Sequence, residues 1–456
     1  MSNILIGQEP LRTSFLMSRI PKITLHRIVD TDAHMLEIRN NIASRDIGIY
    51  IHVPYCRTSC LFCPYFRTVL KDKSEIDKYF NYLLKEIDLY GRFLEKHSLK
   101  VIELHVGGGT PSIVPGKYFK KILEKLSEYF NVETSIGLEA NPEDLLDLRV
   151  AEDLYSNGVD EISLGIQSFS KKILLSLGRK HTPEDNMRAI ENCLKTRFNW
   201  VNIDLMFLPP NIKNFVNYSP GEKLELFKKD LLISIETGVD QVTYYATIIP
   251  SFSPGGKLID LGRISQEGEE IDIFIKSAIE ILSSHKMYMT RIYSFSREKY
   301  EYATVNLEMI GPLIGFGAGA WSNTGSYQYI NTHNILEYSE FLNKGVSSAI
   351  YARKISRGSG VWRLLFDQLF TAGRMSKEAY KLINVKRFPT SIKLYIQLLK
   401  LSGLVRELGD KYVLTEKGVI EAYKAMINYI VNVPIKITNI LIDLGLKRSY
   451  PSRLEL

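Results

Sequence analysis

Short apolar runs rich in β-branched residues alternate with amphipathic stretches through the first half of this sequence. The runs that predict buried strands are residues 47–53, 101–106, 135–140, 161–166, 201–207 and 241–247. A stretch with helical periodicity follows each run, as at residues 74–96, 119–130 and 223–237. Consecutive strand–helix units predict a parallel sheet with right-handed crossovers. The simplest such fold is a full or partial (β/α) barrel of six units, which places the chain in the α/β class.

The pattern changes in the last third of the chain. Residues 315–320 predict a glycine-rich strand or bulge, and helical periodicity begins at about residue 355. Gly403 ends one helix, residues 404–406 and 412–414 flank a Gly-Asp turn, and Thr415 caps a further helix. Helices followed by a small hairpin predict a mostly helical, winged-helix-like domain.

These patterns divide the chain into four segments. We expect a lead segment at residues 1–46, a core barrel with accessory strands at residues 47–350, the winged-helix-like domain at residues 351–431 and a tail at residues 432–456. Within the core, Ser74 with Asp77 three residues later predicts the N-cap of the first helix. Neither the lead segment nor the tail has a pattern that predicts its role.

Composition excludes several classes of protein. The 456 residues are 45% hydrophobic and 24% charged, as in ordinary globular proteins, and four cysteines are too few for a disulfide scaffold. We find neither a secretory signal nor an apolar window long enough to span a membrane, so we expect a cytoplasmic protein. The net charge of +7 is spread over interleaved lysines and glutamates, which argues against nucleic-acid binding as the main function.

Three of the four cysteines lie within eight positions, at Cys56, Cys60 and Cys63. Three thiolates with this spacing can hold a [4Fe–4S] cluster and leave one iron open to a non-protein ligand. The amino and carboxylate groups of S-adenosylmethionine can fill that position, and an electron from the cluster can then cleave the sulfonium to give a 5′-deoxyadenosyl radical. The alternative is structural zinc with Cys193 or a histidine as fourth ligand, but zinc sites favour C-x2-C pairs, and Cys193 lies on an apolar helix face where a core thiol is expected.

Polar residues follow the predicted strands at their carboxyl ends. The Gly-Gly-Gly-Thr-Pro run at residues 107–111 follows the second strand, and no Lys-Ser or Lys-Thr pair follows it, which argues against a phosphate-binding P-loop. Glu139 and Gln167 end the third and fourth strands, Asp204 lies within the fifth, and Arg179 follows on a helix. Each alone is more often a cap or turn residue, but the carboxyl ends of barrel strands are where (β/α) barrels build active sites.

These motifs resemble those of the radical S-adenosylmethionine superfamily. They are most similar to oxygen-independent coproporphyrinogen III oxidase and its relatives, the HemN-like group. The matching motifs are Tyr-Ile-His-Val-Pro-Tyr-Cys at residues 50–56, the glycine run, Glu-Ala-Asn-Pro at 139–142, Ser-Leu-Gly-Ile-Gln-Ser-Phe at 163–169, Leu-Gly-Arg-Lys-His-Thr at 177–182 and Gly-Phe-Gly-Ala-Gly-Ala at 315–320. The resemblance covers about residues 47–338 and resumes at 404–418.

The resemblance implies a radical SAM barrel with a definite set of site residues. Cys56, Cys60 and Cys63 would bind the [4Fe–4S] cluster. The residues implied to bind S-adenosylmethionine are Tyr50, Gly108, Gly109, Thr110, Glu139, Gln167, Arg179 and Asp204. Residues 315–320 would line the substrate side, where this group can hold a second S-adenosylmethionine.

Departures from the group fall on the substrate side. The oxidase has a further cysteine where this chain has Tyr65, and residues 160–161, 207–210 and 305–306 also differ from the family pattern. We expect an oxidoreductase that abstracts hydrogen from its substrate, with the decarboxylation of coproporphyrinogen III in porphyrin biosynthesis as the first hypothesis. The alternatives are a methyltransferase acting on heme or another sp2 carbon, and a heme-binding chaperone.

The expected partners follow from this chemistry. They are a small-molecule substrate such as a tetrapyrrole and an acidic electron donor such as ferredoxin or flavodoxin, which the positive net charge would suit. No membrane partner is expected.

Overall fold

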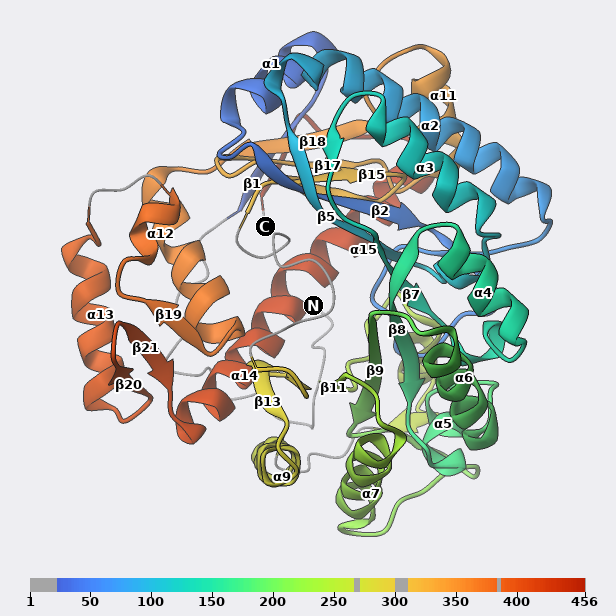
Figure 1. Cartoon of the computed structure of the whole chain (residues 1–456), viewed down its shortest axis with the longest axis vertical. Coiled ribbons are helices and arrows are strands. Elements are labelled where there is room, and N and C mark those ends of the chain that lie inside the picture. The colour runs from blue at the N-terminus through green and yellow to red at the C-terminus, as the bar shows by residue number, and fades with distance from the viewer. Residues whose placement is uncertain (1–22, 266–270, 300–310, 384–386, 456) are drawn as a thin grey trace.

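The computed structural model describes residues 23–265, 271–299, 311–383 and 387–455 (Figure 1). Its centre is a parallel sheet whose strands follow the sequence predictions. In spatial order, with neighbours parallel, these strands are β15 (Leu313–Phe316), β2 (Asp46–Val53), β5 (Lys100–Gly108), β7 (Ile136–Ala140), β8 (Val159–Gln167), β9 (Trp200–Phe207) and β11 (Gln241–Ala246). All six predicted strands are confirmed, and β15 from the glycine-rich region adds a seventh.

Antiparallel strands extend the sheet at both edges. Next to β11 lie β14 (Ser294–Ser296) and β13 (Tyr288–Arg291). Beyond β15 come β16 (Trp321–Asn323), β17 (Tyr327–Asn331), β18 (Ala349–Lys354), β1 (Thr24–Arg27) and β22 (Arg453–Glu455). Short strands elsewhere are β3 (Tyr55–Cys56), β4 (Thr68–Val69), β6 (Asn131–Val132), β10 (Asn211–Ile212) and β12 (Ile264–Ser265). The pairing of β1 with β22 joins the first described strand to the last.

Helices α2 to α7 cover the outer face of the parallel strands (Figure 1). The helices of this part of the chain are α1 (Thr31–Asn41), α2 (Ser74–Leu94), α3 (Lys117–Ser127), α4 (Leu148–Ser156), α5 (Lys171–Ser176), α6 (Pro183–Thr196), α7 (Glu222–Thr237), α8 (Pro254–Asp260), α9 (Ile271–Ser284) and α11 (Ile335–Asn343). Short 3-10 turns occur at Glu95–His97, Pro111–Ile113, Pro142–Asp144 and Ala379–Ile383.

Two local expectations were wrong. Ser74 is the first residue of α2 rather than its N-cap, which is Lys73, and the carboxylate of Asp72 accepts the Ser74 backbone N–H at 2.8 Å. The segment at residues 177–182 lies between α5 and α6 rather than on a helix, because Gly178 adopts φ +72° and Thr182 caps α6.

The C-terminal region contains the predicted helices and hairpin. Its elements are α12 (Arg357–Leu365), a π-helical segment (Phe366–Thr371), β19 (Arg374–Ser376), α13 (Thr390–Leu401), β20 (Val405–Leu408), β21 (Lys411–Leu414), α14 (Glu416–Ile430), a second π-helical segment (Val431–Ile435) and α15 (Lys436–Lys447). The β20–β21 hairpin is confirmed, and β19 adds a third strand on β21. Thr415 caps α14, since its Oγ1 accepts the Gly418 N–H at 3.1 Å.

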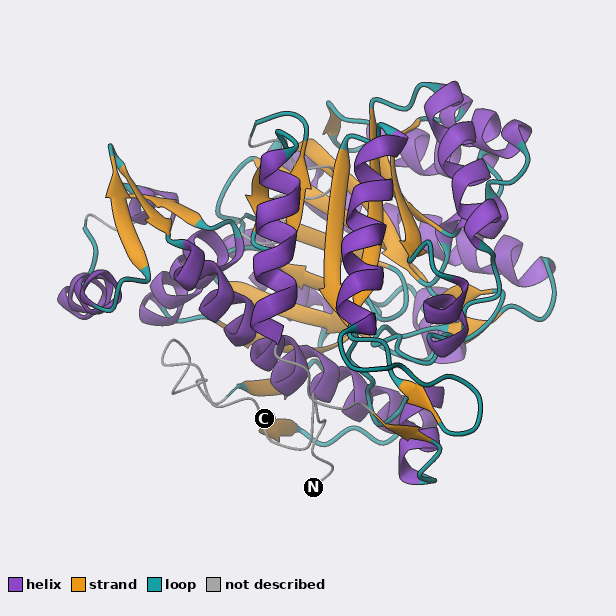
Figure 2. Ribbon diagram, turned by 90° about the horizontal axis from the view of Figure 1, so that it is seen from below, coloured by secondary structure: helices purple, strands orange, loops and turns teal. Residues whose placement is uncertain are grey.

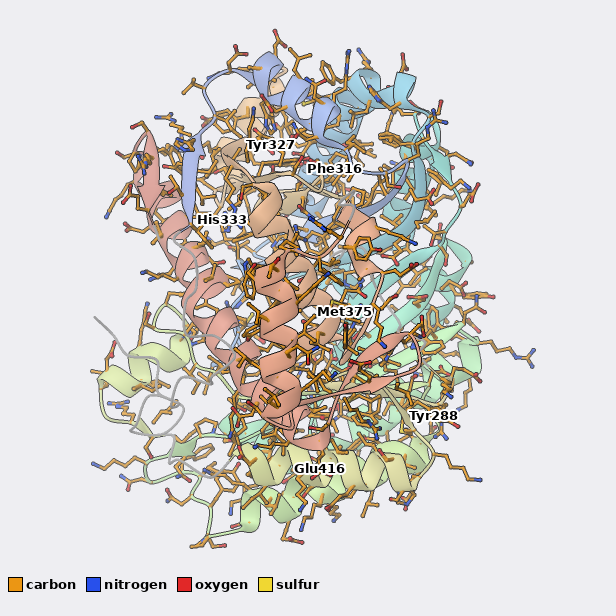
Figure 3. All side chains as sticks on the ribbon, turned by 90° about the vertical axis from the view of Figure 1, so that its left-hand side faces the viewer. Tyr288, Phe316, Tyr327, His333, Met375 and Glu416 are labelled. Carbon is orange, nitrogen blue, oxygen red and sulfur yellow. The ribbon has the colours of Figure 1, made fainter. Side chains whose placement is uncertain are left out.

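This small sheet stands to one side of the main sheet (Figure 2). In Figure 3, Met375 marks β19 and Glu416 the start of α14, while Phe316 and Tyr327 mark the main sheet. Helices α14 and α15 then run back across the concave side of the main sheet (Figure 1). No helix among the described residues combines the length and apolarity needed to cross a bilayer.

Candidate functional site

The cysteine loop begins where β2 ends, at the carboxyl edge of the parallel sheet. Cys56 lies on β3, and β4 pairs with it in parallel, so the backbone N–H of Thr68 donates to Pro54 O at 2.7 Å and that of Leu70 to Cys56 O at 2.9 Å. These bonds close the loop at its base. Cys56 is buried, while Cys60 and Cys63 are half-buried, and all three thiols are free of disulfides.

Arg67 crosses the cysteine loop and donates to it at four points. Its Nη1 donates to the carbonyl oxygens of Cys63 at 3.2 Å and Tyr65 at 3.1 Å. Its Nη2 donates to Cys60 O at 3.2 Å and Ser59 Oγ at 2.8 Å. A single guanidinium therefore fixes the backbone on both sides of Cys60 and Cys63. Sequence reasoning missed Arg67, although a basic residue four positions after the last cysteine was the signal available.

Arg179 reaches the same loop from the segment between α5 and α6. Its Nη1 donates to Cys60 Sγ at 3.2 Å, and its Nη2 donates to Gly165 O at 2.6 Å and Asn141 Oδ1 at 2.8 Å. Its buried Nε has no hydrogen-bond partner. Arg179, which the sequence predicted for S-adenosylmethionine, thus lies against a predicted cluster ligand with donor capacity left over.

The thiols lie in surroundings that favour their neutral form in the absence of metal. Burial raises the pKa of Cys63 to about 12, against the positive charge of Arg67, which lowers it. Burial likewise raises the pKa of Cys56. An iron–sulfur cluster binds cysteines as thiolates, so the thiols lose their protons when it binds. The positive charge of the iron then compensates the buried negative charge of the thiolates. The pKa of Cys193 is also raised by burial, on α6 within the apolar core, as expected of a structural thiol.

Among the described residues, no three Cys, His, Asp or Glu side chains are arranged to hold a metal ion as they stand. The fit of a cluster is therefore judged from the donor set. Three free thiols on one loop, two guanidinium groups beside them and the unpartnered Nε atoms of Arg67 and Arg179 suit a sulfide-rich, anionic group.

The glycine run at residues 107–110 holds the base of the cysteine loop. The N–H groups of Gly109 and Thr110 donate to Val53 O and Tyr55 O, both at 2.7 Å. A Cβ at Gly109 would lie 2.5 Å from Tyr55 O, so this close crossing of β5 over the end of β2 requires glycine. These amides, expected from the sequence to face a ligand, are instead hydrogen-bonded to the protein.

Glu139 links the glycine run to an aromatic and imidazole group inside the barrel. Its Oε2 accepts the Gly108 N–H at 2.9 Å, and its Oε1 lies 3.4 Å from His105 Nε2. Burial alone would raise the pKa of Glu139, but the hydrogen bond and charge of His105 bring it below its usual value. Tyr50 stacks on His105 at 6.1 Å between ring centroids. Tyr50, Gly108 and Glu139 are therefore brought together.

Asp204 lies on β9 near Glu139 in the same interior. Its oxygens accept hydrogen bonds from Ser163 Oγ at 3.1 Å and Asn202 Nδ2 at 3.0 Å. Burial raises the pKa of Asp204 to about 7, and the charge of Glu139 adds to the effect. Gln167 ends β8 with φ +66°, a left-handed conformation that turns the chain between Gly165 and the buried Ser168.

The predicted residues thus form two neighbouring groups. Cys56, Cys60, Cys63 and Arg179 surround the loop, with Gly109 and Thr110 beneath it. Tyr50, Gly108, Glu139 and Asp204 line the interior beside them. Gln167 lies near the first group, because the Gly165 carbonyl that precedes it accepts from Arg179.

A turn after β7 carries two acidic residues that sequence reasoning missed. Glu143 Oε2 lies 3.1 Å from His181 Nδ1; burial would raise the pKa of Glu143, but His181 and the charge of Arg179 lower it to about 2. Asp144 pairs with Arg57 of the cysteine loop and accepts from Ser112 Oγ at 2.8 Å. The signal was the Pro-Glu-Asp sequence that extends the Glu-Ala-Asn-Pro motif.

The glycine-rich run at residues 315–320 is buried and its amides are occupied. The N–H groups of Gly317, Ala318 and Gly319 donate to Glu86 Oε2, Tyr79 Oη and Thr332 O at 2.7 to 2.9 Å. Phe66 of the cysteine loop packs where a Cβ at Gly319 would lie, 2.7 Å from its ring. In this structure the run supports the cysteine loop. The departure at residues 305–306 lies outside the described residues.

Helix α8 holds the tip of the cysteine loop. The Gly255 N–H donates to Leu61 O at 3.2 Å, and the Leu61 N–H donates to Leu177 O at 3.3 Å. Ser253 caps α8 with its Oγ accepting the Gly256 N–H at 3.2 Å. Sequence reasoning missed this contact, because only the Ser-Pro-Gly-Gly sequence at residues 253–256 marks the helix start.

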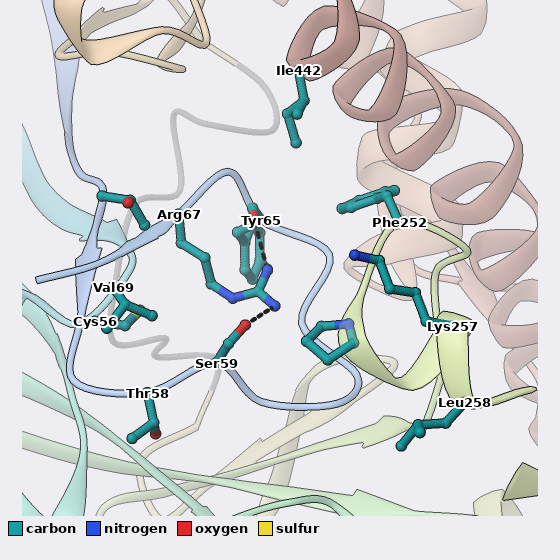
Figure 4. Close-up of a pocket in the computed structure, with 12 residues that line it drawn as sticks. Cys56, Thr58, Ser59, Tyr65, Arg67, Val69, Phe252, Lys257, Leu258 and Ile442 are labelled. Carbon is teal, nitrogen blue, oxygen red and sulfur yellow. Dashed lines mark hydrogen bonds between the residues drawn. The ribbon is translucent and has the colours of Figure 1, made fainter. Parts of the chain in front are cut away.

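A cavity of about 510 Å³ opens beside the cysteine loop (Figure 4). The loop forms one wall, α8 a second, and Ile442 of α15 reaches it from the tail. The lining residues are Cys56, Thr58, Ser59, Tyr65, Arg67, Thr68, Val69, Phe252, Pro254, Lys257, Leu258 and Ile442. Cys56 is the only lining residue, among those described, that the sequence had predicted for the site.

Comparison with known proteins matches this arrangement to one superfamily. The family model of the radical SAM superfamily matches residues 50–215. The coproporphyrinogen III oxidase HemN of Escherichia coli, a radical SAM enzyme of known structure, superposes with a TM-score of 0.72 at 20% identity, covering 88% of this chain and 94% of that one. Residues 50–215 thus match the radical SAM family, and the fold of the chain is similar to that of HemN.

Sequence relatives narrow this to a group. The heme chaperone HemW of Buchnera aphidicola is 26% identical over 387 residues, covering 82% of this chain and 95% of the relative. HemW of Lactococcus lactis is 26% identical over 294 residues, covering 63% and 73%. Oxygen-independent coproporphyrinogen III oxidase of Pseudomonas aeruginosa is 22% identical over 322 residues, covering 66% and 67%. The chain is similar to proteins of the HemN/HemW-like group, and the radical SAM family that its residues 50–215 match implies a [4Fe–4S] cluster and S-adenosylmethionine.

Proposed function

We propose that this protein is a radical enzyme that binds a [4Fe–4S] cluster through Cys56, Cys60 and Cys63 and cleaves S-adenosylmethionine. When bound and reduced, the cluster supplies the electron for that cleavage. The observation that carries the proposal is the contact of Arg179 with Cys60, because it joins the cysteine loop to groups at the carboxyl ends of β7 and β8. In a (β/α) barrel this edge is where cofactor and substrate meet.

The residues around the loop have distinct roles in this proposal. Arg67 and Arg179 hold the loop and offer positive charge to an anionic group. Glu139 offers a carboxylate, kept ionised by His105, to the ammonium or ribose of S-adenosylmethionine. The Glu139 side chain is 38% exposed, so its carboxylate is accessible to a ligand.

The test is S-adenosylmethionine cleavage by the anaerobically reconstituted full-length protein with dithionite. We expect 5′-deoxyadenosine, its loss in Cys60→Ala, and its retention in Cys193→Ala, a matched control because Cys193 is a core thiol. One zinc per chain with no iron or sulfide in anaerobically purified protein would contradict the proposal. An acidic ferredoxin or flavodoxin is proposed as the natural donor, and it should replace dithionite.

Coproporphyrinogen III is the first proposed substrate, because relatives of this chain include oxygen-independent coproporphyrinogen III oxidases. The oxidase has a further cysteine where this chain has Tyr65, which is exposed at the cavity. The chain therefore differs from the oxidase beside the cysteine loop. Mass spectrometry after incubation decides between oxidative decarboxylation and an unchanged mass. An unchanged mass with continued S-adenosylmethionine cleavage would favour the alternative of methyl transfer to heme or another sp2 carbon.

Heme chaperoning is the second candidate function. It is favoured by the similarity to HemW heme chaperones, because the match covers up to 95% of a HemW chain. Stoichiometric hemin binding by the reconstituted protein, without 5′-deoxyadenosine formation in the presence of candidate substrates, would support it. Hemin binding accompanied by substrate conversion would support the enzyme.

A further inference from the structure

The cavity beside the cysteine loop has a cation, Lys257, and an apolar wall that the proposed roles of the cluster and S-adenosylmethionine do not use. Apart from Cys56, its described lining residues contribute nothing to the two groups of predicted cofactor residues. Its volume of about 510 Å³ falls within the range of roughly 300–1,000 Å³ that small-molecule sites occupy. The cavity therefore has room for a small molecule.

Both charged groups on the cavity wall are cations. Arg67 lies on the loop side and Lys257 on α8, and no aspartate or glutamate occurs among the described lining residues. Arg67 holds the cysteine loop through four contacts and is assigned to the cluster in the proposed function, so Lys257 is the cation left for a further ligand. No ion pair within the described ranges involves Lys257, whose side chain extends from α8 toward the cavity (Figure 4).

The rest of the wall is apolar. Tyr65 and Val69 of the loop are 56% and 44% exposed, which is high for such side chains. Phe252 and Leu258 face them from the α8 region, and Ile442 reaches in from α15 (Figure 4). Exposed apolar side chains gathered around a cavity indicate a surface that a ligand covers.

We propose that this cavity binds the substrate through a carboxylate on Lys257 and an apolar ring body against Tyr65, Phe252 and Ile442. The proposal rests on the proposed function, because it places the substrate beside Cys56. It assigns Lys257 and Ile442 as specificity-determining residues, one for charge and one for shape. A small hydrophilic anion would match the cations but leave the apolar wall uncovered, so a carboxylate-bearing ring system fits better.

Binding of coproporphyrin III, a stable and fluorescent tetracarboxylate, to the reconstituted full-length protein tests the charge. We expect Lys257→Gln to weaken binding about tenfold, the effect of losing one charge-assisted hydrogen bond, and Lys257→Glu to weaken it further. Lys257→Arg should restore most of the affinity. The matched control is Lys195→Gln, an exposed lysine on α6.

Two substitutions on α15 test the apolar contact with the ligand. Ile442→Ala should weaken binding, whereas Leu446→Ala, 77% exposed on the same helix, should not. The tetramethyl ester of coproporphyrin III should bind weakly to the unmodified protein. The inference is overturned if the ester binds as tightly as coproporphyrin III, or if Lys257→Glu and Ile442→Ala leave the binding of coproporphyrin III unchanged. Either result leaves a tetrapyrrole substrate possible at another site. Failure of the unmodified protein to bind coproporphyrin III overturns both the inference and a tetrapyrrole substrate, and 5′-deoxyadenosine formation then shows whether the radical chemistry survives.

Discussion

Two arginines from different parts of the chain organise the cysteine loop. Arg67 belongs to the loop and donates to its carbonyl oxygens, while Arg179 comes from beyond α5 and donates to Cys60 Sγ. The planar guanidinium, with five donors in fixed positions, suits this task better than a lysine. These contacts hold the loop backbone in place, and a supported loop needs less ordering to bind a cluster.

Arg67→Ala should lower the amount of iron and sulfide retained after anaerobic reconstitution. Removal of groups that orient metal ligands typically reduces metal affinity by about 10- to 100-fold. Arg67→Lys should retain an intermediate amount, because it keeps the charge but not the four contacts. Iron and sulfide per chain are the measurement, with Arg92→Ala, 72% exposed, as the control. Full iron content in Arg67→Ala would show that the other contacts of the cysteine loop are enough to hold it for cluster binding.

Asp230 on α7 is a buried carboxyl with a structural role. It accepts hydrogen bonds from Ser168 Oγ and the Phe169 N–H, and burial raises its pKa to about 7. The folded state thus binds the proton more tightly than the unfolded state, so its stabilising contribution is present below about pH 4 and is lost as the pH rises through 7. The loss amounts to at most about 4 kcal/mol.

Asp230→Asn should remove this pH dependence. The free energy of unfolding of the variant relative to the unmodified protein should rise between pH 5 and pH 8, measured by urea denaturation. Asp443→Asn, at an exposed carboxyl on α15, should show no such change. If the free energies of unfolding of Asp230→Asn and the unmodified protein differ by the same amount at both pH values, Asp230 stays ionised in the folded state.

At the scale of elements, short apolar runs predicted all six strands because parallel strands buried on both faces have little polar content. The predicted strand ends placed Glu139 and Gln167 correctly at the carboxyl edge of the parallel sheet. The sequence could not show that α8 touches Leu61 or that Ile442 reaches the cavity, because such contacts join segments far apart in the chain. The boundary expected at Ser74 shifted, because a sequence pattern places a helix end only to within about one or two residues.

The contact between α8 and the cysteine loop depends on a glycine. A Cβ at Gly255 would lie 2.5 Å from Leu61 O, and that oxygen is also the acceptor of the Gly255 N–H. Gly255→Ala should therefore displace the loop tip, lower the free energy of unfolding by about 1–3 kcal/mol and reduce iron retention.

Gly360→Ala on α12 is the control for this substitution. No heavy atom lies within 4 Å of a Cβ built there, so alanine should stabilise the helix by about 0.5–1 kcal/mol. Urea denaturation and iron analysis of both variants are the measurements. Equal iron content in the two variants would show that the loop tolerates movement of α8.

At the scale of the whole molecule, the C-terminal helices connect the two halves of the sheet. Tyr423 of α14 donates to Tyr244 O of β11 at 3.0 Å. At the far end, Asn334 Nδ2 donates to Gly445 O at 2.8 Å, and β22 pairs with β1. The tail thus packs on the edge of the sheet that holds the first described strand, and places Ile442 at the cavity on the way.

The tail and this edge share an apolar cluster separate from the main core. Its buried members are Ile23, Leu25, Ile330, Ile350, Tyr351, Val433, Ile437, Leu441 and Tyr450. Residues that pack in a separate cluster often unfold as a separate unit. Leu441 is 0% exposed within it, so Leu441→Ala should cost about 2–5 kcal/mol of local stability.

Amide hydrogen exchange followed by mass spectrometry measures where that loss appears. We expect faster exchange in Leu441→Ala for peptides covering β1, β18 and β22, and unchanged exchange for β8 and β9, whose side chains belong to the main cluster. Leu446→Ala, on the exposed side of α15, should leave all of these peptides unchanged. Uniformly faster exchange across the sheet would mean that the tail and the barrel unfold as one unit. In that case a substrate contact at Ile442 would be coupled to the stability of the whole barrel, rather than to the tail and the edge of the sheet on which it packs.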